Sequence, residues 1–318
     1  MVKNIFISLL AAFVYLSIAS AANAQDPNDG PRQQVRTVSI PISIFTKEEL
    51  RRDQAEEFIQ AERLTVREDD EEQTILSIRS VTEAPLYLAV VIQDDLSSNF
   101  NLQIKDIGNF IRSLPKGSRV MVVYLRGGTL QIRQRFTDDL DKAAESLRIV
   151  ASSSAVAPRN PYDGLIDVMN RFDALPAGRR AVLLVSDGLD VSQGISGSTP
   201  GQSADLKRAI LRAQRRSVSV FSFYSPASLT DNGNSLLVLN GQGSLSELSK
   251  QTGGRAFFSG SSAPLNFDPF FRDLGILLNR QFLLSYLSTH MKKGYHRIEV
   301  LSSNPTVTIE HPKGYYYR

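Results

Sequence analysis

Cysteine is absent from all 318 residues of the sequence. Disulfide bonds and a lipidated amino-terminal cysteine are therefore excluded, so the hydrophobic core must hold the fold. The chain is long enough to bury a large core, and it amounts to about two domain equivalents of roughly 150 residues. An excess of charge of one sign is also lacking. The 36 basic and 33 acidic residues leave a net charge of +3, which gives no electrostatic reason to expect nucleic acid as a partner.

Sequence signatures of several enzyme classes are missing as well. No Gly-x-Gly-x-x-Gly follows a predicted strand, and neither Gly-x-x-x-x-Gly-Lys nor Gly-x-Ser-x-Gly occurs. The histidines His290, His296 and His311 lack the spacing of zinc proteases, so we expect them on the surface or in strand packing. Because no nucleophile and general base occur together, the sequence predicts a protein that is not an enzyme.

The amino terminus has the order of features found in secretory signals. Lys3 precedes an uncharged apolar run over 5–18, and small residues follow up to Ala24. The run is shorter than the about 20 apolar residues that a membrane span needs, and no later segment could be one. We therefore expect a signal peptide over 1–24, a linker over 25–34, and a secreted or periplasmic protein. An uncleaved amino-terminal anchor is the alternative.

From Pro85 onward, apolar strands alternate with helices. Runs that are apolar throughout, such as Leu86 to Ile92, are typical of parallel strands covered on both faces. The alternation predicts one α/β domain over 85–280, with a doubly wound, mostly parallel, Rossmann-like sheet. The Ser-, Asn- and Gly-rich stretch 230–246 is expected to be a functional or mobile loop. The predicted strands are 86–92, 120–125, 130–136, 181–185, 218–223 and 256–258, and the predicted helices are 100–114, 140–150, 162–175, 204–216 and 245–250.

Short strands are predicted at both ends of the chain. The amino-terminal segment 35–84 contains the alternating, Val- and Ile-rich stretch 35–45 and two shorter strands around an acidic turn. Three further strands are predicted in the carboxyl-terminal segment 281–318. A small set of strands with one apolar face is marginal alone. We therefore expect the two segments to pack together as one small β-rich module.

Oxygen-bearing side chains follow two strands of the predicted sheet. Asp94, Asp95, Ser97 and Asn99 come after the first strand of the domain, and Asp187 follows the Ala-Val-Leu-Leu-Val strand. In an open parallel sheet, ligands bind where the carboxyl ends of the strands meet. Carboxylate, hydroxyl and amide oxygens are the ligands that Mg²⁺ prefers. The sequence therefore predicts an oxygen-rich site suited to Mg²⁺ at the ends of these two strands, with Asp94 as a solvated neighbour.

The Asp-x-Ser-x-Asn stretch also has a simpler interpretation. Ser97, Ser98 or Asn99 can cap the following helix by accepting a hydrogen bond from its first free backbone amides. The capping interpretation and the metal interpretation make different demands on the Ser97 hydroxyl, which is a cap acceptor in one and a free ligand in the other.

The two elements together resemble the metal-ion-dependent adhesion site of von Willebrand factor type A domains. In that family one strand ends in Asp-x-Ser-x-Ser and a later strand in Asp-Gly, which stand here as Asp95-x-Ser97-x-Asn99 and Asp187-Gly188. The chain also resembles an exported bacterial, acidobacterial-type family with such a domain, in the stretches 64–78, 248–258, 280–286 and 314–318. The resemblance implies a non-catalytic adhesion or protein-interaction module, whose protein ligand offers an acidic side chain to the metal.

Two positions depart from the pattern of that family. Asn99 replaces the second serine, although its carbonyl oxygen can still ligate. The threonine expected before the helix that begins at Tyr162 falls near Arg159, where no hydroxyl is present. A guanidinium there can pair with Asp95 and Asp187 in place of a cation. We therefore expect weak or absent Mg²⁺ binding, and a metal-free structural scaffold of the cell envelope is the alternative function.

Overall fold

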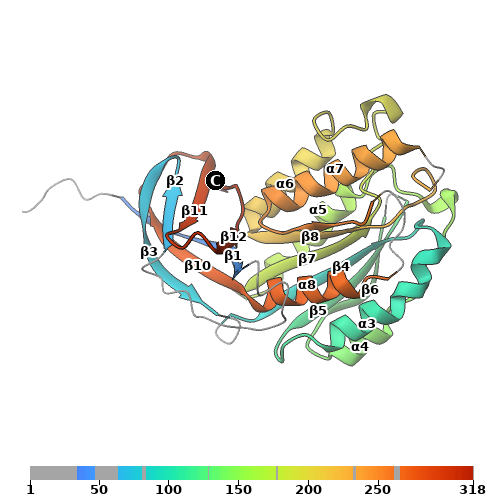
Figure 1. Cartoon of the computed structure of the whole chain (residues 1–318), viewed down its shortest axis with the longest axis horizontal. Coiled ribbons are helices and arrows are strands. Elements are labelled where there is room, and N and C mark those ends of the chain that lie inside the picture. The colour runs from blue at the N-terminus through green and yellow to red at the C-terminus, as the bar shows by residue number, and fades with distance from the viewer. Residues whose placement is uncertain are drawn as a thin grey trace, which may run out of the picture. The chain divides into compact units, whose positions relative to one another are not determined.

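The strands of the described residues form two β-sheets, one six-stranded and one seven-stranded (Figure 1). The computed structural model describes residues 34–46, 64–80, 84–127, 129–176, 178–231, 234–260 and 266–317. The predicted signal peptide lies outside the described residues, and so does the predicted linker up to residue 33. Among the described helices, none has both the length and the hydropathy to cross a membrane.

The six-stranded sheet has the order β6-β5-β4-β7-β8-β9 (Figure 1). Its strands are β4 (Leu86–Gln93), β5 (Arg119–Arg126), β6 (Thr129–Thr137), β7 (Arg179–Ser186), β8 (Val218–Tyr224) and β9 (Ala256–Phe257). All neighbouring pairs are parallel except β5 with β6. Counted along the chain within this sheet, the order is 3-2-1-4-5-6, the doubly wound arrangement. The predicted α/β fold class is therefore confirmed.

Helices cover both faces of this sheet. On one face lie α3 (Ile104–Arg112), α4 (Leu140–Glu145) and α8 (Asp268–Asn279), and on the other α5 (Tyr162–Asn170), α6 (Ala204–Arg216) and α7 (Ser235–Gln251). Residues of β4 alternate between the two cores: Val90 packs on the α3 side and Val91 on the α5 side. Every residue of β4 is buried as a result, which explains its unbroken apolar sequence. Short 3-10 segments are η2 (Ser98–Gln103), η3 (Ser154–Val156), η4 (Arg171–Ala174) and η5 (Ile195–Gly197).

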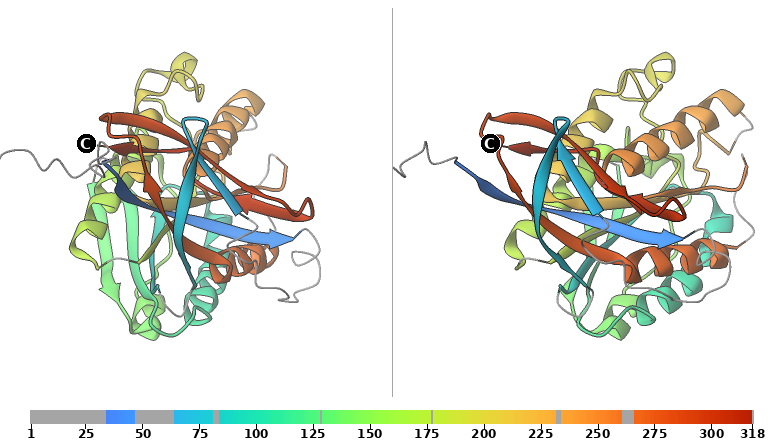
Figure 2. Two further views of the ribbon diagram at one scale, coloured as in Figure 1. Left: turned by 90° about the vertical axis from the view of Figure 1, so that its left-hand side faces the viewer. Right: turned by 60° about the vertical axis from the view of Figure 1, so that its left-hand side comes forward.

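The seven-stranded sheet is built from both ends of the chain (Figure 2). It is antiparallel, in the order β12-β1-β10-β3-β2-β11-β13. The amino-terminal β1 pairs with the carboxyl-terminal β10 from Arg36 opposite Ser288 to Ser43 opposite Gln281. The predicted β-rich module is therefore confirmed. Its strands are β1 (Arg36–Thr46), β2 (Leu64–Glu68), β3 (Glu71–Arg79), β10 (Gln281–Ser288), β11 (Gly294–Ser302), β12 (Val307–Glu310) and β13 (Gly314–Tyr317).

The stretch 230–246 was predicted as a loop, and this prediction is wrong for most of its length. Helix α7 begins at Ser235 and runs to Gln251. Asn234 caps it, since its side chain accepts hydrogen bonds from the amides of Leu236 (3.2 Å) and Leu237 (3.3 Å). Serine, asparagine and glycine are weak helix formers, so the local signal is poor. Burial of one side of the helix against the sheet supplies the stability that propensity does not.

Two other helices differ from the prediction. The predicted helix 140–150 ends at Glu145. Helix α8 was not predicted, although a proline lies in its first turn and its buried residues Phe271, Leu274 and Leu278 recur at three- and four-residue spacing. These residues belong to the core on the α3 face of the six-stranded sheet.

Candidate functional site

Gln93 connects the two strands that carry the predicted site. Strands β4 and β7 are parallel neighbours with Ile92 opposite Val185, so both end at the same edge of the sheet. The Gln93 Nε2 donates to Asp95 Oδ1 (2.8 Å), while its Oε1 accepts from the Ser186 hydroxyl (2.5 Å) and the Asp187 amide (3.3 Å). A single buried amide therefore fixes the loops that bear Asp95 and Asp187.

Two glycines let helix α7 approach the Asp187 loop closely. A Cβ at Gly241 would lie 2.1 Å from the Asp187 carbonyl oxygen, and a Cβ at Gly188 would lie 2.5 Å from the Gly241 carbonyl oxygen. Gly188 also has a φ of 68°, which favours glycine. The Tyr162 hydroxyl donates to the Gly188 carbonyl (2.6 Å). The backbone around Asp187 is thus held from two helices.

Hydroxyl groups from the loop after β8 complete the polar cluster. The Ser228 hydroxyl donates to Asp95 Oδ2 (2.8 Å), and the Thr230 hydroxyl lies 3.4 Å from Asp187 Oδ2. The amide of Leu189 donates to Asp187 Oδ1 (3.1 Å). Sequence reasoning did not identify Gln93, Ser228 or Thr230. The run of hydroxyl residues directly after a strand next to β7 was the available signal for the last two.

The cluster contains two buried carboxylates, Asp95 and Asp187, with no basic side chain paired to them among the described residues. Asp95 and Asp187 are 3 % and 4 % exposed. Burial, followed by the negative charge of Asp95, raises the pKa of Asp187 to about 7. Among the described residues, no ion pair joins a basic side chain to either carboxylate. A cation between them would relieve both the repulsion and the cost of burial.

Arg159 does not take the place of a cation. Its backbone carbonyl accepts from the Val191 amide (2.9 Å), and the residue lines a cavity of about 280 Å³ together with Asn160 and Ser192. Within the described part of the chain, its guanidinium forms no ion pair with Asp95 or Asp187. The structure therefore does not support the interpretation in which Arg159 neutralises Asp95 and Asp187.

Ser97 and Asn99 differ in their surroundings. The Ser97 amide donates to the Pro226 carbonyl (2.9 Å), and its buried hydroxyl makes no hydrogen bond to any described residue. Ser97 precedes η2 as its N-cap, but its side chain does not cap the amides, so the capping interpretation is wrong for this serine. Asn99 is exposed, and no hydrogen bond of its side chain is found among the described residues. The Ser97 hydroxyl is thus free to serve as a ligand.

Asp94 was expected to be a solvated neighbour, and this expectation is wrong. Its carboxylate is fully buried and accepts two hydrogen bonds from the Arg148 guanidinium (2.7 and 3.0 Å) and one from the Ala151 amide (3.1 Å). The Arg126 guanidinium lies 3.7 Å away. Asp94 is therefore neutralised by an arginine and does not belong to the Asp95 and Asp187 pair.

Comparisons with known proteins give no close relative. The sequence matches no family model, and no curated protein matches it. Solved structures similar to this chain include an aerotolerance-related membrane protein from Bacteroides fragilis (10% identity, 60% of this chain, 98% of the other, TM-score 0.40). They also include the SpRpn10 VWA domain (14%, 60% and 93%, TM-score 0.40) and the manganese-loaded TRAP protein of Plasmodium vivax (11%, 78% and 97%, TM-score 0.41). At such values the likeness does not establish kinship, and the fold class rests on the strand order itself.

Proposed function

We propose that this protein is a non-catalytic interaction module that binds a protein ligand through a divalent metal, Mg²⁺ in the first instance, at the edge formed by Asp95, Ser97 and Asp187. The observation that carries the proposal is the buried pair of carboxylates without a basic partner among the described residues, next to a serine hydroxyl without a hydrogen bond. Oxygen ligands of this kind suit Mg²⁺, which keeps several waters in its shell. Asn99 remains a proposed ligand through its side-chain carbonyl.

Exposed apolar side chains on the surrounding loops support a protein as the ligand. Leu229 lies between the two hydroxyl residues of the site, Leu102 lies on η2 beyond Ser97, and Leu236 lies in the first turn of α7. Leu102 is 75 % exposed and Leu236 is 61 % exposed. Exposed apolar patches next to polar groups mark protein-interaction sites. An acidic side chain of the partner would complete the metal shell, as the resemblance to von Willebrand factor type A domains implies.

The proposal also includes the cellular location of the protein and its domain boundaries. We propose export to the periplasm or the cell exterior, because residues 1–24 have the order of a secretory signal. The proposed domain over 85–280 then carries the metal edge, and the segments 35–84 and 281–318 form the accompanying β-rich module. No feature of the sequence or of the described structure favours nucleic acid as a partner.

A metal-free scaffold is the second candidate, and one observation favours it. All four oxygens of Asp95 and Asp187 already lie within hydrogen-bond distance of a protein donor. With a proton on Asp187, the pair would carry one negative charge and would need no metal. The β-rich module would then make the functional contacts.

Titration calorimetry with Mg²⁺ and Mn²⁺ separates the two candidates. The metal proposal expects saturable binding by the wild type and by Asp231→Asn. Asp231 is an exposed carboxylate on the loop after β8 that carries Ser228 and Thr230, so this variant is the matched control. It expects no binding by Asp95→Ala or Asp187→Asn, provided that circular dichroism shows both to be folded. Arg159→Thr, which adds the hydroxyl of the family pattern, should strengthen binding. No binding heat in the wild type and in Arg159→Thr would leave the scaffold as the function.

A further inference from the structure

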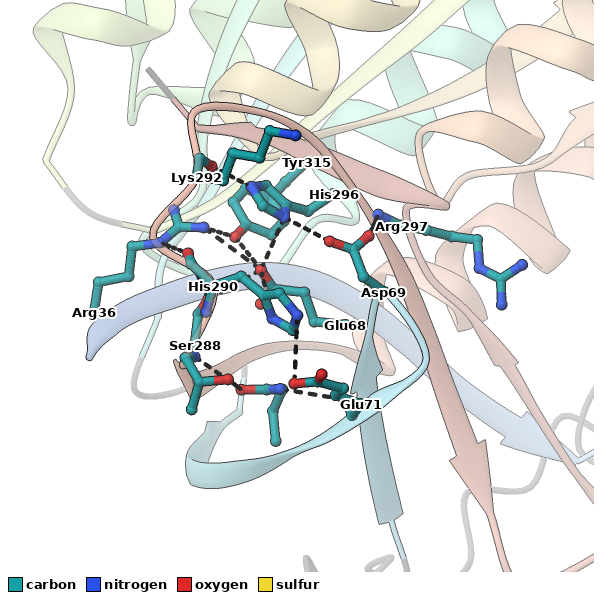
Figure 3. Close-up of polar contacts among 12 residues, drawn as sticks. Arg36, Glu68, Asp69, Glu71, Ser288, His290, Lys292, His296, Arg297 and Tyr315 are labelled. Carbon is teal, nitrogen blue, oxygen red and sulfur yellow. Dashed lines mark hydrogen bonds and ion pairs between the residues drawn. The ribbon is translucent and has the colours of Figure 1, made fainter. Parts of the chain in front are cut away.

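A second group of ionisable side chains surrounds the turn between β2 and β3 (Figure 3). The turn residues Asp69 and Asp70 have φ angles of 49° and 72°, which Asp and Asn tolerate better than other residues with side chains. The Asp69 amide donates to the Arg297 carbonyl (3.0 Å), and Asp69 Oδ1 accepts from the Arg297 amide (2.8 Å). The Asp69 carboxylate is therefore held in place beside β11, with Oδ2 left for another contact.

Glu68, the last residue of β2, is fully buried beside this turn. Its Oε1 accepts from the hydroxyls of Tyr315 (2.6 Å) and Ser288 (2.9 Å) and lies 3.5 Å from the Arg36 guanidinium. Its Oε2 is buried but makes no hydrogen bond to any described residue. Burial, followed by the charge of Glu68, raises the pKa of the Tyr286 hydroxyl, which lies near this carboxylate. A buried carboxylate oxygen without a partner is costly.

His296 on β11 faces both carboxylates, as Figure 3 shows. Its Nε2 lies 2.7 Å from the Lys292 carbonyl oxygen, which can only accept, so the hydrogen-bond network assigns the ring proton to Nε2. Its Nδ1 lies 2.8 Å from Asp69 Oδ2 and 3.4 Å from Glu68 Oε1. In the neutral ring Nδ1 is an acceptor, so three acceptors would face one another. Either a second ring proton or a cation must lie between them.

His290 brings a second imidazole to the same carboxylate. Its Nδ1 lies 3.7 Å from Glu68 Oε1 and makes no hydrogen bond to a described residue, while its Nε2 lies 3.5 Å from Glu71 Oε2. The ring centroids of His290 and His296 are 5.9 Å apart. The expectation that the histidines serve only surface or strand packing does not account for this convergence.

We propose that Glu68, Asp69 and His296, with His290 as a fourth donor, bind a divalent transition metal of the zinc class. Imidazole and carboxylate together suit Zn²⁺ and related ions better than Mg²⁺. Potential ligand atoms of the first three residues all lie within 4.8 Å of one another. Ligands in a tetrahedron around zinc are roughly 3.3 Å apart, close to the 3.4 Å between His296 Nδ1 and Glu68 Oε1. The Lys292 carbonyl fixes the ring so that Nδ1 ligates.

The charges of the cluster leave room for such an ion. Glu68 and Asp69 carry two negative charges, and Arg36 supplies one positive charge beside them. The Arg297 guanidinium is paired with Asp70 on the exposed side of the turn. A metal here would join the β2–β3 turn from the amino-terminal segment to the β10–β11 region from the carboxyl-terminal segment. In a chain without cysteine, the ion would connect the two segments as a disulfide does in other proteins.

The test is a titration of the metal-stripped protein with Zn²⁺ against a chromophoric chelator, with the melting temperature measured in parallel. Asp69→Asn removes a charged ligand and tolerates the positive φ, and Asp70→Asn is the matched control on the same turn. We expect the wild type and Asp70→Asn to bind Zn²⁺ and to melt at a higher temperature with it. Asp69→Asn and His296→Gln should bind more than about tenfold more weakly and lose the shift.

Two further measurements separate this site from the proposed Mg²⁺ site at Asp95 and Asp187. They also do not depend on whether the Asp69 and His296 variants fold. Asp95→Ala should retain the Zn²⁺ effect, since Asp95 lies in the loop after β4 of the six-stranded sheet. X-ray absorption of the wild-type zinc complex should show imidazole as well as oxygen donors. The proposal is overturned by an oxygen-only shell, by equal binding in Asp69→Asn and Asp70→Asn, or by loss of binding in Asp95→Ala. It is equally overturned if the wild type binds no Zn²⁺, in which case a second proton on His296 bridges the carboxylates.

Discussion

The two sheets each bring a pair of carboxylates together, but they balance the charge differently. At the edge of the α/β sheet, Asp95 and Asp187 are contacted by hydroxyls and amides. In the β-rich module, Glu68 and Asp69 face an arginine and two imidazoles. An oxygen-only environment suits a hard ion such as Mg²⁺, whereas nitrogen donors favour a zinc-class ion. The neutral and basic groups around each pair of carboxylates, and not the number of acids, therefore set the chemistry of the cluster.

The largest expected effect concerns Asp94, the neighbour of Asp95 that already has a cation. Arg148→Met leaves the buried Asp94 carboxylate with only the Ala151 amide and the Arg126 guanidinium 3.7 Å away, so we expect a loss of about 3 kcal/mol in the free energy of unfolding. The exposed pair of Arg112 with Asp141 is the control, and Arg112→Met should cost less than about 1 kcal/mol. Urea unfolding measures both. Equal losses would mean that Asp94 is no more dependent on its arginine than a surface acid, and the contrast with Asp95 would disappear.

The next effect concerns His311, which forms no ion pair with a carboxylate of the described residues. Burial, followed by the charge of Lys313, lowers the pKa of His311 to about 4 from the ordinary 6.5. Between these values the unfolded chain binds more protons than the folded one. The contribution of His311 is therefore fully present above about pH 6.5 and is lost as the pH falls to about 4, by at most about 3 kcal/mol.

The variant His311→Gln isolates this contribution. The difference in unfolding free energy between wild type and variant should change with pH over that window and stay constant above about pH 7. Thermal or urea unfolding from pH 4 to 8 gives the difference. A difference that does not vary with pH would show that the surroundings of His311 do not hold it neutral.

A smaller effect tests how the α/β edge is held. Gly241→Ala places a Cβ against the Asp187 carbonyl oxygen, so we expect a loss of about 1–3 kcal/mol in stability together with weaker Mg²⁺ binding. Gly275→Ala is the matched control, because its Cβ would meet nothing within 4 Å on α8, and alanine there should be neutral or stabilising. If both variants behave alike, the close approach of α7 does not position Asp187.

The smallest effect sharpens the ligand set itself. Loss of the free hydroxyl in Ser97→Ala should weaken Mg²⁺ binding about tenfold, or about 1.4 kcal/mol. Asn99→Ala should change it less than about threefold, because the side chain is exposed and makes no contact within the described cluster. Calorimetry on both variants measures the ratio. A larger loss for Asn99→Ala would restore the three-residue motif as the sequence pattern has it.

Much of the fold followed from local pattern. The apolar run of β4 and the helical spacing of α6 are visible in the sequence because each element is buried on the faces its pattern indicates. The predicted helix 245–250 covers only the end of α7, and the part from Ser235 to Ser244 was missed because its serines and glycines contact the sheet and the Asp187 loop but have low helix propensity. The glycine contacts that lower the helix propensity of this segment are also the contacts that position the Asp187 loop.

Local sequence patterns indicated most of the strands and helices and the acids after β4 and β7, because these features depend on residues close together in the chain. The tertiary fold fixes which charge meets which partner. Asp94 meets Arg148, Asp187 lies beside Thr230, and Glu68 meets His296. Each partner is distant in sequence. Their meeting depends on strand pairing and helix packing across the whole chain, and no local spacing encodes it.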